Sequence, residues 1–323
     1  MKFLRYGLAV CLLSLGLFGG KALAAKPTSI TAKGISLTPA IENLTLSGSP
    51  STSFIIQIDN HGDSAVSLST SSLDFKSLNE TGGLAFIGSS SSAIGYKYGL
   101  ASWLNLPTAP IVLKPHSSQQ ITIGVSNRSD LYPGGHYAAI LFKKTGGSGS
   151  SSNQVGVNQV IATLVFLKKS GGEIYSLSLQ KPDFPAAWLK IPSNLDLLFT
   201  NTGNTQTAPR GSVVITDPLG REIKRGIINP DSSLTLPDST RLYTTQLYSI
   251  VNPWIPGRYK ATVRYRPDDV SQLKTTSYSF VYLSLPFVIL GSALLMAVVI
   301  FVWSVRRSIK RARRVRKIPV KIL

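Results

Sequence analysis

The sequence predicts an all-β fold of two tandem immunoglobulin-like β-sandwiches followed by one transmembrane helix. Three observations lead to this prediction. Residues 25–282 alternate short apolar stretches with clusters of Gly, Pro, Asn and Ser and lack a sustained helical stripe, which is typical of a β-sandwich. Two sequence elements recur in the same order in both halves of this region. Residues 283–305 then run without a charge.

The first 24 residues are predicted to form a signal peptide. Lys2 and Arg5 precede the apolar run 8–18, and small residues flank Leu23 in Ala22-Leu23-Ala24. An uncleaved anchor is the weaker alternative because the run is shorter than the ~20 residues that cross a bilayer. Cleavage after Ala24 would remove the only cysteine, so the exported chain would hold no disulfide, a habit more typical of bacterial surface proteins than of animal secreted domains.

The first β-sandwich is predicted over residues 25–170 and the second over 171–282, with the boundary near 169–172, where KKSGG interrupts the apolar pattern. The Gly-Ser run 146–152 is predicted to be a mobile hairpin loop. The clear strands of the first half are 54–59, 111–113, 120–126, 137–142 and 160–166. Those of the second half are 175–179, 195–200, 211–216, 258–265 and 278–282.

The two halves repeat each other in two places. An alternating apolar triplet precedes Asn60-His61-Gly62 in the first half and Asn201-Thr202-Gly203 in the second. Each triplet places its side chains on one face, so both strands are expected to bury that face and end in a tight turn. A Pro-Gly step then leads to Tyr137 in one half and to Tyr259 in the other. We expect each ring to pack inward while its hydroxyl meets a loop backbone group.

Segment 82–110 does not fit a minimal sandwich, because it places Tyr96, Tyr98 and Trp103 among Gly and Ser residues. A loop of this length with aromatic residues either packs down as a lid or binds a partner. Tyr96, Tyr98 and Trp103 are therefore the candidate ligand-binding residues. For Trp103 the surrounding leucines of 100–106 favour packing in the core, since large aromatic side chains are usually mostly buried.

Residues 283–305 are long enough to cross a bilayer as a helix with some tilt. Nine cations follow in the tail 306–323, which predicts a cytoplasmic tail and exported β-sandwiches, because basic residues stay on the cytoplasmic side. The tail is interpreted as a topology signal, and docking to anionic lipid or to an intracellular partner is the alternative.

The net charge of +19 lies mostly at the two ends. Three cations fall in residues 1–24 and nine in 284–323, with no acid in either stretch, which leaves 22 cations against fifteen acids between them. That middle region lacks the basic stripe of a nucleic-acid-binding protein, so no nucleic-acid partner is predicted.

The inventory of catalytic groups is nearly empty. His61, His116 and His136 are the only histidines, and they lack the paired spacing of zinc motifs. Asp59 and Asp63 flank a turn too short for an EF-hand, so a capped turn is the better interpretation. The chain is therefore predicted not to be an enzyme and to carry neither a cofactor nor a metal.

Three stretches resemble the WxL-interacting proteins of Gram-positive cell surfaces. They are Ile35-Ser36-Leu37-Thr38-Pro39-Ala40, Ile111-Val112-Leu113-Lys114-Pro115 and the run at 133–142, with Asn201-Thr202-Gly203-Asn204 and Leu236-Pro237-Asp238-Ser239 similar in the second half. The resemblance lies in layout and turn motifs, and implies an adhesion or scaffold role on peptidoglycan or on host or partner proteins. The chain departs from that family in its Gly-Ser loop and in lacking an obvious binding motif.

The predicted function is that of a single-pass bacterial cell-surface protein that binds cell-wall polymer or surface proteins through its exported β domains. The predicted contact surfaces are the aromatic segment 96–103 and the sheet edges of the first domain, where an exposed edge could accept a partner strand. The alternative is an accessory subunit of a membrane complex, recognised through its helix and basic tail. Exchanging residues 283–323 for an unrelated anchor distinguishes the two, because only the second function would be lost.

Overall fold

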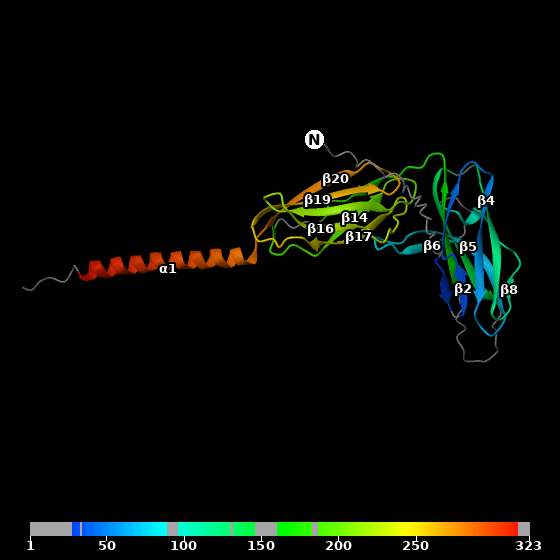
Figure 1. Ribbon diagram of the computed structural model, residues 1–323, viewed down its shortest axis with the longest axis horizontal. Helices are drawn as coiled ribbons and strands as arrows, with labels where there is room; N and C mark the ends of the chain where they lie inside the picture. The colour runs from blue at the N-terminus through cyan, green and yellow to red at the C-terminus, as the bar shows by residue number, and fades with distance from the viewer. Residues whose placement is uncertain are drawn as a thin grey trace, which may run out of the picture.

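The computed structural model describes residues 28–32, 34–88, 96–129, 132–145, 160–182 and 187–315 (Figure 1). The structure is mostly β, with 53% strand and 12% helix, and one apolar helix lies at its C-terminal end. The predicted signal peptide 1–24 and Gly-Ser loop 146–152 lie outside the described residues.

Residues 30–169 form two sheets that we call the N-terminal body. Sheet A has the strand order β1-β2-β4-β9-β7, and sheet B has the order β3-β11-β10-β5-β6, with β8 paired to β5. All neighbours are antiparallel except β3 and β11, which are parallel. The strands are β1 (Ile30–Ala32), β2 (Ile35–Thr38), β3 (Ile41–Leu46), β4 (Ser51–Asn60), β5 (Val66–Ser77), β6 (Leu84–Gly88), β7 (Leu104–Asn105), β8 (Ile111–Leu113), β9 (Ser117–Ser126), β10 (Gly134–Thr145) and β11 (Val160–Lys169), and the 3-10 helix η1 spans Ala101–Trp103.

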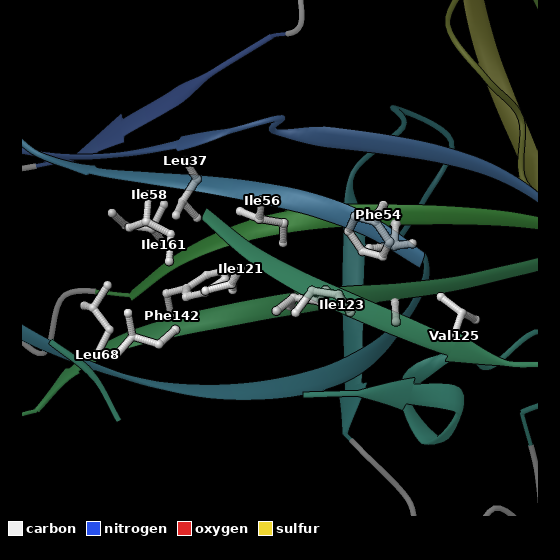
Figure 2. Packing of buried hydrophobic residues seen from close by; sticks show 14 of the residues in the cluster. Leu37, Phe54, Ile56, Ile58, Leu68, Ile121, Ile123, Val125, Phe142 and Ile161 are labelled. Atoms are coloured by element: carbon white, nitrogen blue, oxygen red, sulfur yellow. The ribbon is translucent and has the colours of Figure 1, made fainter. Parts of the chain in front are cut away.

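The core of the N-terminal body lies between sheets A and B (Figure 2). The side chains of a strand alternate between its two faces, so the apolar triplet of β4 points inward as expected. Phe54, Ile56 and Ile58 lie beside the inward residues of β9 and face Phe142 and Leu68 of sheet B. This burial fixes the register of β4, because a slip by one residue would turn the triplet to solvent.

Residues 177–282 form a second pair of sheets, the C-terminal body. Sheet C has the order β12-β14-β17, and sheet D has the order β13-β20-β19-β15-β16-β18, with only β13 and β20 parallel. A separate apolar cluster fills the space between them. The strands are β12 (Leu177–Leu179), β13 (Ala187–Trp188), β14 (Asn194–Asn201), β15 (Pro209–Thr216), β16 (Glu222–Ile228), β17 (Thr240–Gln246), β18 (Tyr248–Ser249), β19 (Gly257–Pro267) and β20 (Lys274–Tyr282).

The repeated asparagines Asn60 and Asn201 end equivalent strands and make the same three hydrogen bonds. The Nδ2 group of Asn60 donates to the carbonyls of Ser64 and Lys114, and its Oδ1 accepts the Gly62 N–H. Asn201 repeats this pattern with the Thr205 and Thr235 carbonyls and the Gly203 N–H. Both side chains are buried, so the amide of each supplies the partners that its turn backbone needs.

The two repeated tyrosines differ in where their rings lie. Tyr259 packs in the core of the C-terminal body and donates its hydroxyl to the Ile255 carbonyl, as the sequence predicts. Tyr137 is equally buried, but its ring lies on the outer face of sheet B, against the C-terminal body. The expectation that both rings point into their own core is therefore wrong for Tyr137, because a second body covers the outer face of its sheet.

Helix α1 (Leu285–Val315) leaves the end of the C-terminal body (Figure 1). It starts two residues later than the predicted 283–305 span and continues as one helix through the first part of the basic tail. Within Leu285–Arg311, an 18-residue window has a mean hydropathy of 2.7 and none of it is buried, so by length and composition the helix suits a membrane.

Candidate functional site

Strand β3 is an edge strand with one unpaired side. Strand β11 covers its other side, and no described strand pairs beyond it. The Leu164 N–H donates to the Ala40 carbonyl, and the Ser170 N–H donates to the Leu46 carbonyl. Because the N–H and C=O of a strand residue point to one side and alternate along the strand, the backbone groups of Ile41, Asn43 and Thr45 point away from β11.

A row of aromatic rings crosses the outer face of sheet B and leads to β3. The rings of Phe86 and Phe75 lie 6.5 Å apart, those of Phe75 and Tyr137 lie 5.8 Å apart, and those of Tyr137 and Phe166 lie 5.6 Å apart. Asn43 pairs with Phe166 in the register of β3 and β11, so β3 lies next to the last ring of the row. Edge-to-face and tilted rings at these spacings stabilise the face that the C-terminal body covers.

A cleft of about 390 Å³ lies where this row meets the C-terminal body. Its apolar floor includes Phe166 and Leu236, which are each less than a tenth exposed. Ile41, at the start of β3, lines the cleft and is 46% exposed. Two further hollows, of about 200 and 440 Å³, also border β3, so the unpaired strand runs along recessed surface.

The far wall of the cleft is the loop between β16 and β17, and hydrogen bonds hold it in place. Arg241 donates from Nη1 to the Leu234 carbonyl at 2.7 Å, and its guanidinium lies 5.5 Å from the centre of the Tyr243 ring. The Tyr243 hydroxyl in turn donates to the Ser233 carbonyl and contacts the Thr235 hydroxyl. The wall therefore keeps its shape without a ligand.

The two bodies are joined by hydrogen bonds beside the cleft. The Tyr137 hydroxyl donates to Gln206 Oε1 at 2.8 Å and accepts the Gln206 N–H at 3.0 Å. The Gly135 N–H donates to the Asn204 carbonyl, and the Asn204 side chain donates to the Pro133 carbonyl. Burial raises the pKa of the Tyr137 hydroxyl well above its usual range, which further favours the protonated form that donates to Gln206.

The three aromatic residues predicted to bind a ligand contact their own chain. Trp103 is 2% exposed and packs in the core of the N-terminal body. Tyr98 is also buried, and its hydroxyl donates to Asp238 Oδ2 at 2.8 Å, while burial raises its pKa above the usual value. Tyr96 is partly buried against the same aromatic cluster. Segment 96–103 thus lies down as a lid, and a ligand-binding role for it stays a prediction that would require its packing to open.

The histidines and carboxylates of the described residues discussed above do not form the set of nucleophile, base and orienting group that a hydrolase needs. Ser36 contacts both His61 (3.0 Å) and Asp59 (3.3 Å), so the carboxylate bonds the hydroxyl and does not orient the imidazole. His116 bonds Asp63 on the exposed surface. Within the described residues no group of three His, Cys, Asp or Glu side chains could hold a metal ion.

His136 is the exception among the histidines, because it is buried beside the lid. Its two ring nitrogens lie 3.2 Å from the Gly99 carbonyl and 3.0 Å from the Tyr132 carbonyl, and its ring packs on Trp103. Desolvation by burial lowers the pKa of His136 below 6.5 and is the largest effect. The two carbonyls favour the protonated ring and raise the pKa, but by less than desolvation lowers it. The nearby charge of Lys169 lowers the pKa further, and that of Asp74 raises it.

This pKa shift predicts that acid destabilises the fold. Below pH 6.5 the unfolded chain binds a proton at His136 that the folded chain does not, so stability present above that pH falls as the pH drops toward the lowered folded value. We expect His136→Gln to flatten the pH dependence of the free energy of unfolding between that value and pH 6.5. Denaturant titrations at pH 7.5 and 5.5 measure it, with His116→Gln as the exposed control. An equal slope in wild type and His136→Gln would contradict the prediction.

Sequence reasoning missed the residues that form the cleft. Asn43, Phe166 and Leu236 lie far apart in the sequence, and the strand β3 (Ile41–Leu46) was not predicted. Phe166 lies in a predicted strand. The one signal for its position on the outer face is that its neighbours Val165 and Leu167 face the core, because side chains alternate between the two faces of a strand.

Comparison with known proteins gives limited similarity. No family model matches the sequence, and no curated protein matches it. Among solved structures, the class 5 fimbriae chaperone CfaA is similar with a TM-score of 0.40 and 10% identity over 78% of this chain and 100% of that chain. The Escherichia coli chaperone DraB gives 0.37 and 11% identity, over 77% of this chain and 96% of that chain. A PapD-like domain of human CEP192 gives 0.29 and 14% identity, over 52% of this chain and 100% of that domain. These TM-scores are too low to assign a function, and the resemblance to WxL-interacting proteins stays a prediction.

Proposed function

We propose that this chain is a membrane-anchored bacterial surface protein that binds an extended segment of another surface protein along β3. The unpaired backbone of Ile41, Asn43 and Thr45 beside the cleft is the observation that carries the proposal. An extended peptide added to this edge would exchange main-chain hydrogen bonds with these residues and place an apolar side chain in the cleft.

A protein partner fits this site better than a cell-wall glycan does. The outward groups of β3 are alternating backbone donors and acceptors, which another polypeptide backbone matches in spacing. The cleft floor is apolar, formed by Phe166, Leu236 and neighbouring leucines, and suits an aliphatic or aromatic side chain. Peptidoglycan remains a predicted partner that another face would have to bind.

The wider architecture in this proposal is two tandem immunoglobulin-like domains on one membrane helix. Each body has its own pair of sheets and its own apolar cluster, which supports the division into residues 25–170 and 171–282. The apolar stretch of α1 and the cations after it support an exported N-terminal side and a cytoplasmic tail.

Asn43→Pro is expected to abolish partner binding while the fold survives. Proline removes the Asn43 N–H, which points away from β11 and has no part in the ladder, and edge strands tolerate proline in that position. A photoreactive amino acid at Ile41 in the full-length chain, activated in the producing cells, should give a discrete crosslinked adduct. We expect the adduct to be lost in Asn43→Pro.

Asn43→Ala is the matched control, because it removes the same side chain but keeps the N–H. A photoreactive residue at Ile227, which is 63% exposed on the C-terminal body, controls for random capture. An adduct that survives Asn43→Pro, or that Asn43→Ala removes equally, would rule out recognition through the backbone of β3.

A further inference from the structure

Exposed apolar side chains gather at the end of the C-terminal body from which α1 leaves. Tyr282 ends β20 and pairs there with Gly257 at the start of β19 and with Trp188 at the end of β13. The turn after β15 and the loop 250–256 lie at the same end. The large apolar side chains exposed there are Leu189 (59%), Leu219 (68%), Ile250 (56%), Val251 (40%), Trp254 (61%) and Leu283 (40%).

The loop that carries Trp254 is held against the body. The N–H groups of Ile250 and Val251 donate to the Ile223 carbonyl, at 2.8 and 3.3 Å. The hydroxyls of Tyr259 and Tyr282 donate to the Ile255 and Pro253 carbonyls on either side of Trp254. Trp254 is therefore presented to solvent on a fixed backbone. Exposure of its apolar surface to water is unfavourable, and contact with an apolar partner would relieve it.

The turn beside this loop is fixed as well. The Gly220 N–H donates to the Asp217 carbonyl, and Asp217 Oδ1 accepts the N–H groups of Leu219 and Arg221. Arg221 also forms an ion pair with the buried Asp217 carboxylate at 2.7 Å. Leu219 thus stands at the tip of a rigid turn.

The charge at this end is positive. Residues 187–190, 216–225 and 248–258 contain four exposed cations (Lys190, Arg221, Arg225 and Arg258) against two carboxylates (Asp217 and Glu222). A fifth cation, Lys224, is buried and donates from Nζ to the Pro192 carbonyl. Both carboxylates are paired with arginines of the same stretch. Exposed apolar residues accompanied by an excess of exposed cations complement an anionic bilayer surface.

We propose that this end of the C-terminal body is a second membrane contact, in which Trp254, Ile250 and Leu219 enter the boundary between headgroups and acyl chains. The proposal depends on the proposed anchoring by α1. Only Leu283 and Ser284 separate Tyr282 from Leu285, a span of about 10 Å at full extension. The body therefore stays at the bilayer surface once α1 is inserted, and aromatic side chains such as Trp254 favour that depth.

Contact with lipid is tested with an environment-sensitive fluorophore on the full-length chain. Cys11→Ser removes the native thiol, and the label is placed through Trp254→Cys in vesicles of phosphatidylcholine with about 30% phosphatidylglycerol. Lipids spin-labelled near the top of the acyl chain should quench this label at least about twofold, because interfacial side chains lie ~5–10 Å into the headgroup and acyl boundary.

Two further labels separate the possible outcomes. Leu273 is 57% exposed at the opposite end of sheet D, so a label placed through Leu273→Cys should not be quenched. A label placed through Phe301→Cys reports insertion of α1. If the label at 301 is quenched but the label at 254 is quenched no more than the label at 273, the membrane contact is overturned and the anchor stands. No quenching at 301 overturns the anchor and the contact with it.

Discussion

Trp103→Ala is expected to lower the free energy of unfolding by about 3–5 kcal/mol, the usual cost of deleting a large aromatic side chain from a core. The ring is 2% exposed and belongs to the apolar cluster between sheets A and B. It also packs on His136 at a centroid distance of 4.5 Å and lies 5.8 Å from the Lys169 ammonium. Truncation would leave a cavity beneath the lid that its rigid neighbours only partly refill.

The lid magnifies this effect, because Trp103 ends the short helix η1 that anchors it. The buried Asp74 carboxylate accepts the N–H groups of Leu100 and Ala101, each at 2.7 Å. The Tyr137 N–H donates to the Tyr98 carbonyl just before that helix. Loss of the indole would therefore loosen contacts that also position the junction between the two bodies.

Trp103→Phe is the matched control, since it keeps an aromatic ring and should recover more than half of the lost stability. Denaturant titration of the full-length chain in detergent measures both variants. A ligand-binding Trp103 would behave differently: its alanine variant would unfold at the wild-type denaturant concentration and lose only binding. That outcome would restore the sequence-based prediction for segment 96–103 and contradict the core role.

The sequence predicts the parts of the fold that alternate cleanly. The triplet before Asn60 and the triplet before Asn201 each carry large apolar residues at every second position, so their strands and inward faces were predictable. The asparagines then mark the turns, because their side chains supply hydrogen bonds to the turn backbone.

Strand β5 shows where this reading fails. It spans twelve residues in the middle of sheet B, yet half of its sequence VSLSTSSLDFKS is serine or threonine, and it is not among the strands that the sequence predicts. Partners on both sides hold it extended, β10 through eight register pairs and β6 and β8 on the other side. Tertiary pairing therefore overrides the weak local preference.

The candidate site was less predictable than the fold, for a reason that Phe166 and Asn43 illustrate. They are adjacent only because β3 joins β11 in parallel, a pairing between strands more than a hundred residues apart. The residue pattern within one strand carries no information about which strand pairs with it. An exposed edge in the first half was a reasonable expectation, but neither β3 nor its cleft could be located from the pattern alone.

Placing two arginines in the middle of α1 is expected to release the chain from the membrane. Leu294 and Val298 lie one turn apart near the centre of the apolar stretch, and both are exposed in the chain alone. Each arginine costs about 2.5–3.5 kcal/mol at the centre of a spanning helix, so Leu294→Arg with Val298→Arg opposes insertion by about 5–7 kcal/mol.

The measurement is the fraction of full-length chain that stays in the membrane pellet after alkaline carbonate extraction. Wild type should stay almost entirely in the pellet, and the double arginine variant should move mostly to the supernatant. The double alanine variant of the same positions is the control and should stay with wild type, because alanine keeps the helix and adds no charge. Alkaline carbonate strips proteins that touch only the bilayer surface, so contact through Trp254 cannot substitute for a spanning helix. A wild-type chain that carbonate extracts, or a double arginine variant that resists it, would show that α1 does not anchor the protein.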